Sequence, residues 1–336
     1  MVKIIGIGNA LVDVLVQLPD DSALQHLGYE RGGMWHIGFE QFERLQEWLT
    51  TVHTERATGG SAANTIHALS ALGASTAYIG NVGLDELGDY FVGMLRHRGI
   101  TDAVTRSTDI RTGVATTFIL PDGERTFATY LGAAPNMDVA SVTRMLHDMR
   151  PRQGHKVILH VEGYLVQDHD FILPVLEAAK AVGMLVSYDL ASWNIVKNDI
   201  DFVRHLVDKY VDIVFANEDE AMAFSGTTDA HDALGMLAEM TMMAVVKVGK
   251  RGAWGRSGTD EEHVPAAECE KVVDTTAAGD FFAAGFLRGY VSGESLRCCL
   301  EMGNIMAVKV IQVLGTKVDD AQLPDALNDV TSKWQP

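Results

Sequence analysis

Short apolar runs alternate along this chain with segments whose apolar residues recur three and four positions apart. The first pattern is typical of buried strands, and the second is typical of helices that pack against a sheet. Strands are predicted near 2–8, 77–83, 156–161, 184–189, 211–215, 243–248 and 270–273. Helices are predicted near 40–52, 86–98, 138–149, 170–182, 199–209, 218–225, 230–240, 280–291 and 294–313. This alternation favours a mostly parallel sheet with helices on both faces.

Two segments break this rhythm. Residues 19–43 are polar and irregular, as a flap over a site would be. Residues 111–131 alternate apolar and polar positions around a turn at Pro121-Asp122-Gly123-Glu124, as the strands of a half-buried hairpin do. Proline and glycine are spread along the chain and not gathered in a linker, so no second independent domain is expected.

Composition narrows the class of protein. The 336 residues are 47% hydrophobic, which is ample for a core, and the formal net charge is −18 without any run of Lys or Arg. Nucleic acids and anionic membranes are therefore not expected as partners. Three cysteines suit neither a disulfide framework nor a zinc site, and no apolar run is long enough to cross a bilayer. We expect a cytoplasmic protein that binds a small molecule, as a monomer or a homodimer.

Two familiar nucleotide motifs are absent from the sequence. The segment Gly6-Ile7-Gly8-Asn9-Ala10-Leu11 follows a predicted strand, but Leu11 stands where a dinucleotide fingerprint needs its third glycine. The chain also lacks the Gly-x-x-x-x-Gly-Lys-[Ser/Thr] pattern of a P-loop. A dehydrogenase and an ordinary P-loop enzyme are both disfavoured.

The stretch from Val272 to Phe282 carries the main chemical signal. It reads as a strand, a loop of small residues and a helix, with Ala277, Ala278 and Gly279 at the helix start. Unpaired amides and the helix dipole make such a start an anion pocket. Asp280 in the first turn is either an ordinary complement to the dipole or a base. A carboxylate beside a phosphate suits a base that takes the proton of an attacking hydroxyl.

Residues 274–280 resemble the second signature of the PfkB, or ribokinase-like, carbohydrate and nucleoside kinases. The resemblance implies that Asp280 is the catalytic base and that the amides of 277–280 form the anion hole. The family usually has glycine where this chain has Ala277, and alanine has a narrower range of φ. A monovalent cation, K⁺, near this loop is also implied by the resemblance alone.

Three further residues are implied to bind the substrate. Gly59-Gly60, followed by Asn64 at the start of a helix, resembles the first PfkB signature, in which the glycines are the hinge of a lid. Asp13 stands at the position where members of the family have an Asp that hydrogen-bonds the sugar hydroxyls of the substrate. On residue type alone, the glycine pair is a flexible turn before a capped helix, and Asp13 is a strand-end residue.

The nucleotide side has motifs of its own. Asn217 and Glu220 match the Asn-x-x-Glu motif, which would order waters around Mg²⁺, although acids at a helix start are common without a metal. Lys247, Gly249 and Gly252 resemble the nucleotide loop, with Lys247 in place of the usual Thr or Ser. The far wall of the adenine pocket is expected at the residues Asn304 and Ala307.

Gly123-Glu124-Arg125, followed by Leu131-Gly132-Ala133-Ala134, is most similar to the adenosine kinase branch, where Arg125 would reach the phosphoryl group. A surface charge at the end of the hairpin is the other interpretation of Arg125. The first acceptor to consider is then the primary hydroxyl of a ribose-containing nucleoside such as adenosine. The alternatives are a kinase of a free sugar such as ribose, fructose or 2-keto-3-deoxygluconate, and a nucleotide-binding regulator without turnover.

The resemblance therefore predicts an α/β fold, a ribokinase-like three-layer α/β/α domain with a central mostly parallel sheet and a small β-sheet lid. The large domain, which would bind ATP and the substrate, is expected to comprise 1–12, 44–110 and 132–336. The lid is expected to comprise 13–43 and 111–131.

Overall fold

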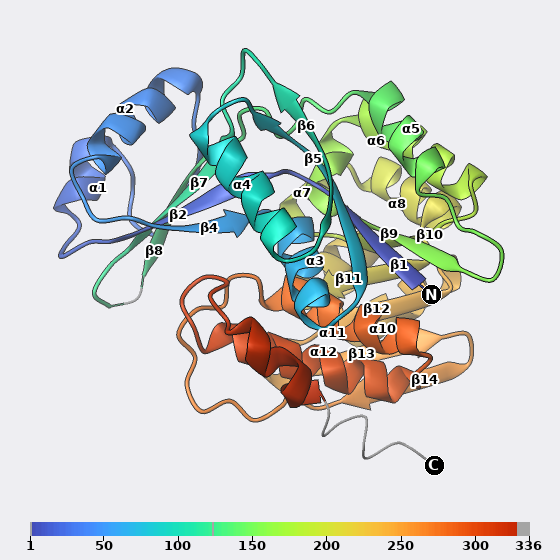
Figure 1. Ribbon diagram of the computed structural model, residues 1–336. Helices are drawn as coiled ribbons and strands as arrows, with labels where there is room; N and C mark the ends of the chain where they lie inside the picture. The colour runs from blue at the N-terminus through green and yellow to red at the C-terminus, as the bar shows by residue number, and fades with distance from the viewer. Residues whose placement is uncertain (1, 123, 328–336) are drawn as a thin grey trace.

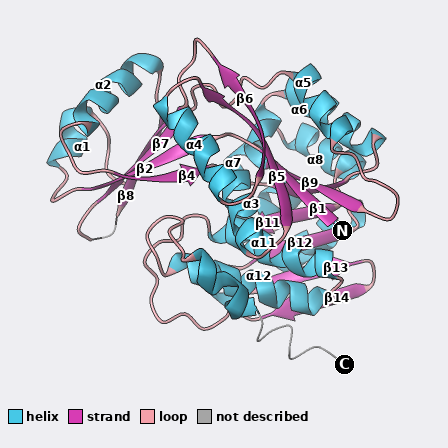
Figure 2. Cartoon of the chain, in the orientation of Figure 1, coloured by secondary structure: helices cyan, strands magenta, loops and turns pink. Residues whose placement is uncertain are grey.

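The computed structural model describes residues 2–122 and 124–327. Gly123 of the expected turn lies outside the described residues. Two sheets organise the chain: a large sheet with helices on both sides, and a small sheet that projects from it together with α1 (Ser22–Leu27) and α2 (Phe39–Leu49) (Figures 1 and 2). No helix among the described residues combines the length and the apolar character needed to span a bilayer.

The large sheet has the strand order β14-β13-β12-β11-β10-β9-β1-β5-β6. All neighbours from β12 to β6 are parallel, while β13 and β14 pair antiparallel. The strands are β1 (Val2–Ile7), β5 (Ser75–Gly83), β6 (Thr101–Ser107), β9 (Lys156–Glu162), β10 (Leu185–Asp189), β11 (Ile213–Asn217), β12 (Met243–Lys247), β13 (Ala253–Ser257) and β14 (Asp260–Val264). The predicted fold class, with a central mostly parallel sheet, is confirmed.

The apolar residues of this sheet face two cores. In β1, Ile4 packs in one core while Ile5 and Ile7 pack in the other, because successive side chains of a strand point to opposite faces. The first core contains α3 (Ser61–Ala71), α4 (Glu86–His97), α11 (Ala278–Ser292) and α12 (Leu296–Ile311). The second core contains α5 (Val139–Asp148), α6 (His169–Ala181), α7 (Trp193–Asn198), α8 (Ile200–Tyr210), α9 (Glu218–Ser225) and α10 (Ala230–Met240). The α/β/α layering follows from this alternation.

One predicted strand is wrong. Residues 270–273 form no strand, and the side chains of Val272 and Val273 are 54% and 41% exposed. The Val273 amide instead donates to the carbonyl of Ile311, the last residue of α12. Two β-branched residues with no neighbouring strand to pair with do not make a strand.

The small sheet has the order β3-β8-β7-β2-β4. Its strands are β2 (Leu11–Gln17), β3 (Met34–His36), β4 (Glu55–Gly59), β7 (Gly113–Ile119) and β8 (Arg125–Tyr130). β4 lies in the range 44–110 that the sequence analysis gave to the large domain, yet it pairs antiparallel with β2 and therefore belongs to the small sheet. The helix α2 covers this sheet, with the ring of Phe42 stacked 4.2 Å from that of Tyr130.

Candidate active site

Polar side chains gather where the parallel strands of the large sheet end. β9, β10, β11 and β12 end at Glu162, Asp189, Asn217 and Lys247. Because these strands are parallel neighbours, their last residues lie along one edge of the sheet. Ligands of open α/β sheets bind at this carboxyl edge.

The start of α11, where the sequence predicts an anion pocket, has no capping side chain. Ala277 precedes the helix in the left-handed conformation, with a φ of 60°, and no side chain caps the helix. No hydrogen-bond partner within the described chain takes the amides of Gly279 and Asp280. These amides and the helix dipole favour a negative group at this position.

Asp280 is held at this pocket by α3. Its Oδ1 accepts from the Ser61 hydroxyl at 2.7 Å, and its Oδ2 accepts from the Asn64 side-chain amide at 2.9 Å. Burial raises the pKa of Asp280 to about 6; the charge of Asp189 acts in the same direction, while Asn64, Ser61 and the ammonium of Lys247 oppose the shift. A carboxylate with a pKa near neutrality is suited to accept a proton.

Asp13 and the glycine pair meet at the base of the small sheet. A Cβ on Gly59 would overlap the carboxylate of Asp13, and a Cβ on Gly60, whose φ is 95°, would overlap the carbonyl oxygen of Asn9. Burial, together with the charges of nearby carboxylates, raises the pKa of Asp13 to about 7. Close packing therefore requires both glycines.

Arg125 connects the small sheet to the loop before the anion pocket. Its Nη1 donates to Asp274 and, at 3.0 Å, to the Thr276 hydroxyl. Both oxygens of Asp274 are occupied, since Oδ2 accepts from the Gly315 amide at 2.6 Å. Burial favours the neutral acid, but these hydrogen bonds outweigh it and hold the pKa of Asp274 below its usual value. The guanidinium thus contacts the loop that leads into α11.

Asn217 and Glu220 cap α9 reciprocally. The Glu220 amide donates to Oδ1 of Asn217 at 2.8 Å, and Oε2 of Glu220 accepts from the Asn217 amide at 2.7 Å. This is a capping box, a local structural reason for the motif. Burial and the charge of Asp189 raise the pKa of Glu220 to about 7, and Lys247 opposes them. Glu220 is only 3% exposed and lies at the carboxyl edge of the sheet, where ligand binding is a second role for it besides helix capping.

The side chain of Lys247 contacts Asp189 and approaches Gly279. Its ammonium donates to Oδ2 of Asp189 at 2.9 Å and lies 3.0 Å from the position that a Cβ on Gly279 would take. Gly249 and Gly252 delimit the turn after β12, with φ values of 58° and 96°.

Asn304 and Ala307 both lie on α12. The side-chain amide of Asn304 donates to the carbonyls of Val264 and Pro265, at 3.3 and 3.0 Å. Asn304 is buried and Ala307 partly buried. Asn304 therefore fastens the loop after β14 to α12 in this structure.

Sequence reasoning missed three residues of this region. Asp189 and Ser61 contact Lys247 and Asp280, and Glu162 accepts from the Asn9 side chain at 2.9 Å and from the Ala62 amide at 3.2 Å. Burial raises the pKa of Glu162 to about 7. Their positions in the sequence could have identified these residues. Asp189 ends a predicted strand, Glu162 follows one, and Ser61 follows the glycine pair.

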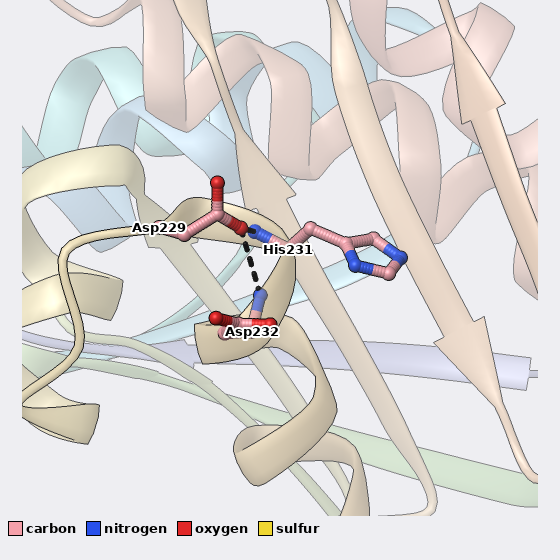
Figure 3. Close-up of side chains that lie close together, drawn as sticks. All are labelled: Asp229, His231 and Asp232. Carbon is pink, nitrogen blue, oxygen red and sulfur yellow. Dashed lines mark hydrogen bonds between the residues drawn. The ribbon is translucent and has the colours of Figure 1, made fainter.

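A second polar cluster lies outside this region. Ligand atoms of Asp229, His231 and Asp232 fall within 4.8 Å of one another. Figure 3 shows that the His231 ring points away from both carboxylates, and its Nε2 contacts Glu261 at 2.8 Å. One oxygen of Asp229 caps α10 by accepting from the amides of His231 and Asp232. Helix capping accounts for this cluster.

The chain is similar in sequence to a family of kinases and to known members of that family. The family described as pfkB family carbohydrate kinase matches residues 39–322. An uncharacterized sugar kinase of Archaeoglobus fulgidus is 31% identical over 261 residues, which are 74% of this chain and 96% of that protein.

Two solved structures are similar over nearly their whole length. A probable sugar kinase from Rhizobium etli has a TM-score of 0.84 and 32% identity, with 98% of each chain covered. The adenosine kinase from Sinorhizobium meliloti has a TM-score of 0.83 and 33% identity, with 97% of this chain and 98% of that chain covered.

Proposed function

Because the chain belongs to the pfkB family of carbohydrate kinases, we propose that it transfers the γ-phosphoryl group of ATP to a primary hydroxyl of a ribose-containing acceptor, a nucleoside such as adenosine. The similarity to the adenosine kinase of Sinorhizobium meliloti supports a nucleoside. The pattern of 123–134, with Arg125 on the first strand after the turn, supports the same branch.

One observation carries the proposal: Asp280 lies in the first turn of α11, beside amides that no group of the described residues occupies, with a pKa of about 6. In this mechanism the ionised carboxylate of Asp280 accepts the proton of the acceptor hydroxyl while that oxygen attacks phosphorus. Ser61 and Asn64 keep the carboxylate at the pocket. The amides of 277–280 stabilise the negative charge on the phosphoryl oxygens. A positioned base contributes about 10² to 10⁴ in rate.

The acceptor contacts Asp13 and Asn64 in this proposal. Asp13 lies on β2 of the small sheet and Asn64 on α3, so the acceptor lies between the small sheet and the anion pocket. A lid over this region excludes water, which would otherwise take the phosphoryl group. Gly59, the last residue of β4, and Gly60, the residue before α3, connect the two parts.

In this proposal, the residues assigned to the nucleotide include oxygen ligands for Mg²⁺. The carboxylate of Glu220 and the carboxylate of Asp189 interact with each other, and Lys247 is the cation beside them. This excess of negative charge fits a divalent cation held partly through water by Glu220 and Asn217. When bound, Mg²⁺ neutralises charge on the nucleotide phosphates. The loop at Gly249–Gly252 and the α12 residues Asn304 and Ala307 are assigned to the nucleotide.

For K⁺ the fit is poorer. Asp274 is the acidic residue that opens the 274–280 segment, and both of its oxygens already accept hydrogen bonds, from Arg125, Thr276 and Gly315. No step of the proposed reaction requires a monovalent cation.

A free sugar is the second candidate acceptor. The relatives from Archaeoglobus fulgidus and Rhizobium etli are both named sugar kinases, which supports this alternative. The two candidates share Asp280 and the anion pocket, and differ in what lies beyond the ribose-like ring.

The test is release of ADP from Mg-ATP with adenosine, inosine, guanosine, ribose, fructose and 2-keto-3-deoxygluconate, each run beside the Asp280→Asn variant. Turnover on a nucleoside that falls by about 10² or more in the variant is expected. Asp170→Asn is the matched control, because Asp170 is an exposed acid in the first turn of α6. Turnover on sugars alone would discard the nucleoside assignment, and full activity of Asp280→Asn would discard the base.

A further inference from the structure

Lys247 and Asp189 form a buried ion pair at the anion pocket. They end the strands β12 and β10, and β11 lies between these strands. Their charged atoms are 2.9 Å apart, and their side chains are only 13% and 8% exposed. The pair is therefore shielded from solvent, and breaking it would leave an uncompensated buried charge.

The ammonium also lies close to the start of α11. It lies 3.0 Å from the position of a Cβ on Gly279, so any side chain at that residue would crowd it. The Gly279 amide is one of the open donors of the pocket. An ammonium has three hydrogen-bond donors, and Asp189 is the one acceptor that it contacts among the described residues. The remaining donors are free for a ligand at the pocket.

We propose that Lys247 is a catalytic residue that binds the oxygens of the transferred phosphoryl group, and that Asp189 is the positioning residue that holds its ammonium at the start of α11. This inference rests on the proposed kinase function and specifies the charge that its anion pocket supplies. Amides alone offer partial charges, while Lys247 adds a full positive charge where negative charge accumulates in phosphoryl transfer.

The surroundings keep Lys247 charged. Burial by itself favours the neutral amine, but the carboxylates of Asp189, Glu220 and Asp280 outweigh it and hold the pKa of Lys247 above its ordinary value. The same three acids come from three different elements, β10, α9 and α11. A cation at their centre lowers the repulsion that an incoming polyphosphate would otherwise meet.

The competing explanation is that the ion pair has a purely structural role. Comparing the binding of an ATP analogue with the binding of ADP distinguishes these two explanations. A contact with the γ-phosphoryl group strengthens binding of the non-hydrolysable ATP analogue AMPPNP but not of ADP. Calorimetry with each nucleotide and Mg²⁺ needs no acceptor. If the unmodified protein binds neither nucleotide, the proposed kinase function fails as well; if it binds both, the variants test this inference alone.

For Lys247→Met we expect AMPPNP affinity to fall by about 10- to 100-fold, the usual effect of losing a hydrogen bond between charged groups. ADP affinity should fall by less than about threefold. Lys247→Arg keeps the charge and should recover part of the AMPPNP affinity. Equal losses for both nucleotides, or no loss, would overturn the role of Lys247. Circular dichroism and thermal unfolding of each variant show that it is folded before binding is compared.

A double variant tests the role of Asp189. If Asp189 acts through Lys247, Asp189→Asn weakens AMPPNP binding in the unmodified protein. In the Lys247→Met background the same change removes an unpaired carboxylate, so AMPPNP affinity should stay equal or recover. A further, additive loss in the double variant would show that Asp189 acts independently, as a metal-binding residue would, and would refute its positioning role.

Discussion

Ala277 provides a stability prediction that can be worked out from the backbone alone. It precedes α11 with a φ of 60°, in the left-handed region. There the Cβ of an L-residue approaches the following carbonyl oxygen, which costs about 1 to 2 kcal/mol, and glycine avoids this cost. Ala277→Gly therefore relieves strain at the edge of the anion pocket.

The gain is reduced by the unfolded state. Glycine gives the unfolded chain more backbone freedom, which costs about 0.5 to 1 kcal/mol. We expect Ala277→Gly to raise the free energy of unfolding by about 0.5 to 1 kcal/mol. With an unfolding entropy of about 2.1 cal/mol/K per residue, this corresponds to a rise of about 1 °C in Tm. The shift is small because the chain is long.

Ala278→Gly is the matched control. Ala278 is the next residue and the first of α11, so glycine there adds freedom to the unfolded chain without relieving strain. The two variants should differ by about 1 to 2 kcal/mol, measured by urea unfolding in the absence of nucleotide and followed by circular dichroism. If Ala277→Gly is no more stable than Ala278→Gly, the strain assigned to Ala277 is refuted.

Two further predictions concern Asp13 and Asp280. Gly59→Ala should lower stability and raise the KM for the acceptor, because the added methyl group displaces the Asp13 carboxylate. Gly38→Ala is the control, because the space around Gly38 is open. Equal effects of the two substitutions would contradict the reasoning. The value of kcat/KM should fall as pH falls through about 6, because protonated Asp280 is neutral and too weak a base to take the acceptor proton. If activity is lost only near pH 4, where an ordinary Asp titrates, burial does not raise the pKa of Asp280.

Local patterns predicted those parts of the fold that local forces decide. The helix at 218–225 matches α9 residue for residue, because Asn217 and Glu220 cap it and Gly226 ends it in the left-handed conformation. The pair Val272-Val273 gave a false strand, because strand formation depends on a neighbour that apolar runs do not reveal. β6, β13 and β14 were missed; β6 is only partly buried and β14 is largely polar, so neither shows a buried apolar run.

The candidate site was predicted as a set of motifs, but not as a set of contacts. Asp280 and Ser61 are 219 residues apart, and Arg125 and Asp274 are 149 residues apart, yet each pair is joined by a hydrogen bond. Such partners depend on the order of strands in the sheet, which spacing within a motif does not encode. For that reason the contact of Arg125 with Asp274 could not be predicted from the sequence, which offered only a phosphoryl contact or a surface charge for this residue.

Close approach, more than backbone flexibility, explains two of the motif glycines. Gly59 leaves room for the carboxylate of Asp13, and Gly279 leaves room for the ammonium of Lys247, each from a different element of the chain. A motif glycine beside an anion pocket therefore indicates that another group must come within contact distance. At Gly279 that group is a cation held by Asp189, so loss of the pair should weaken phosphate binding in addition to lowering stability.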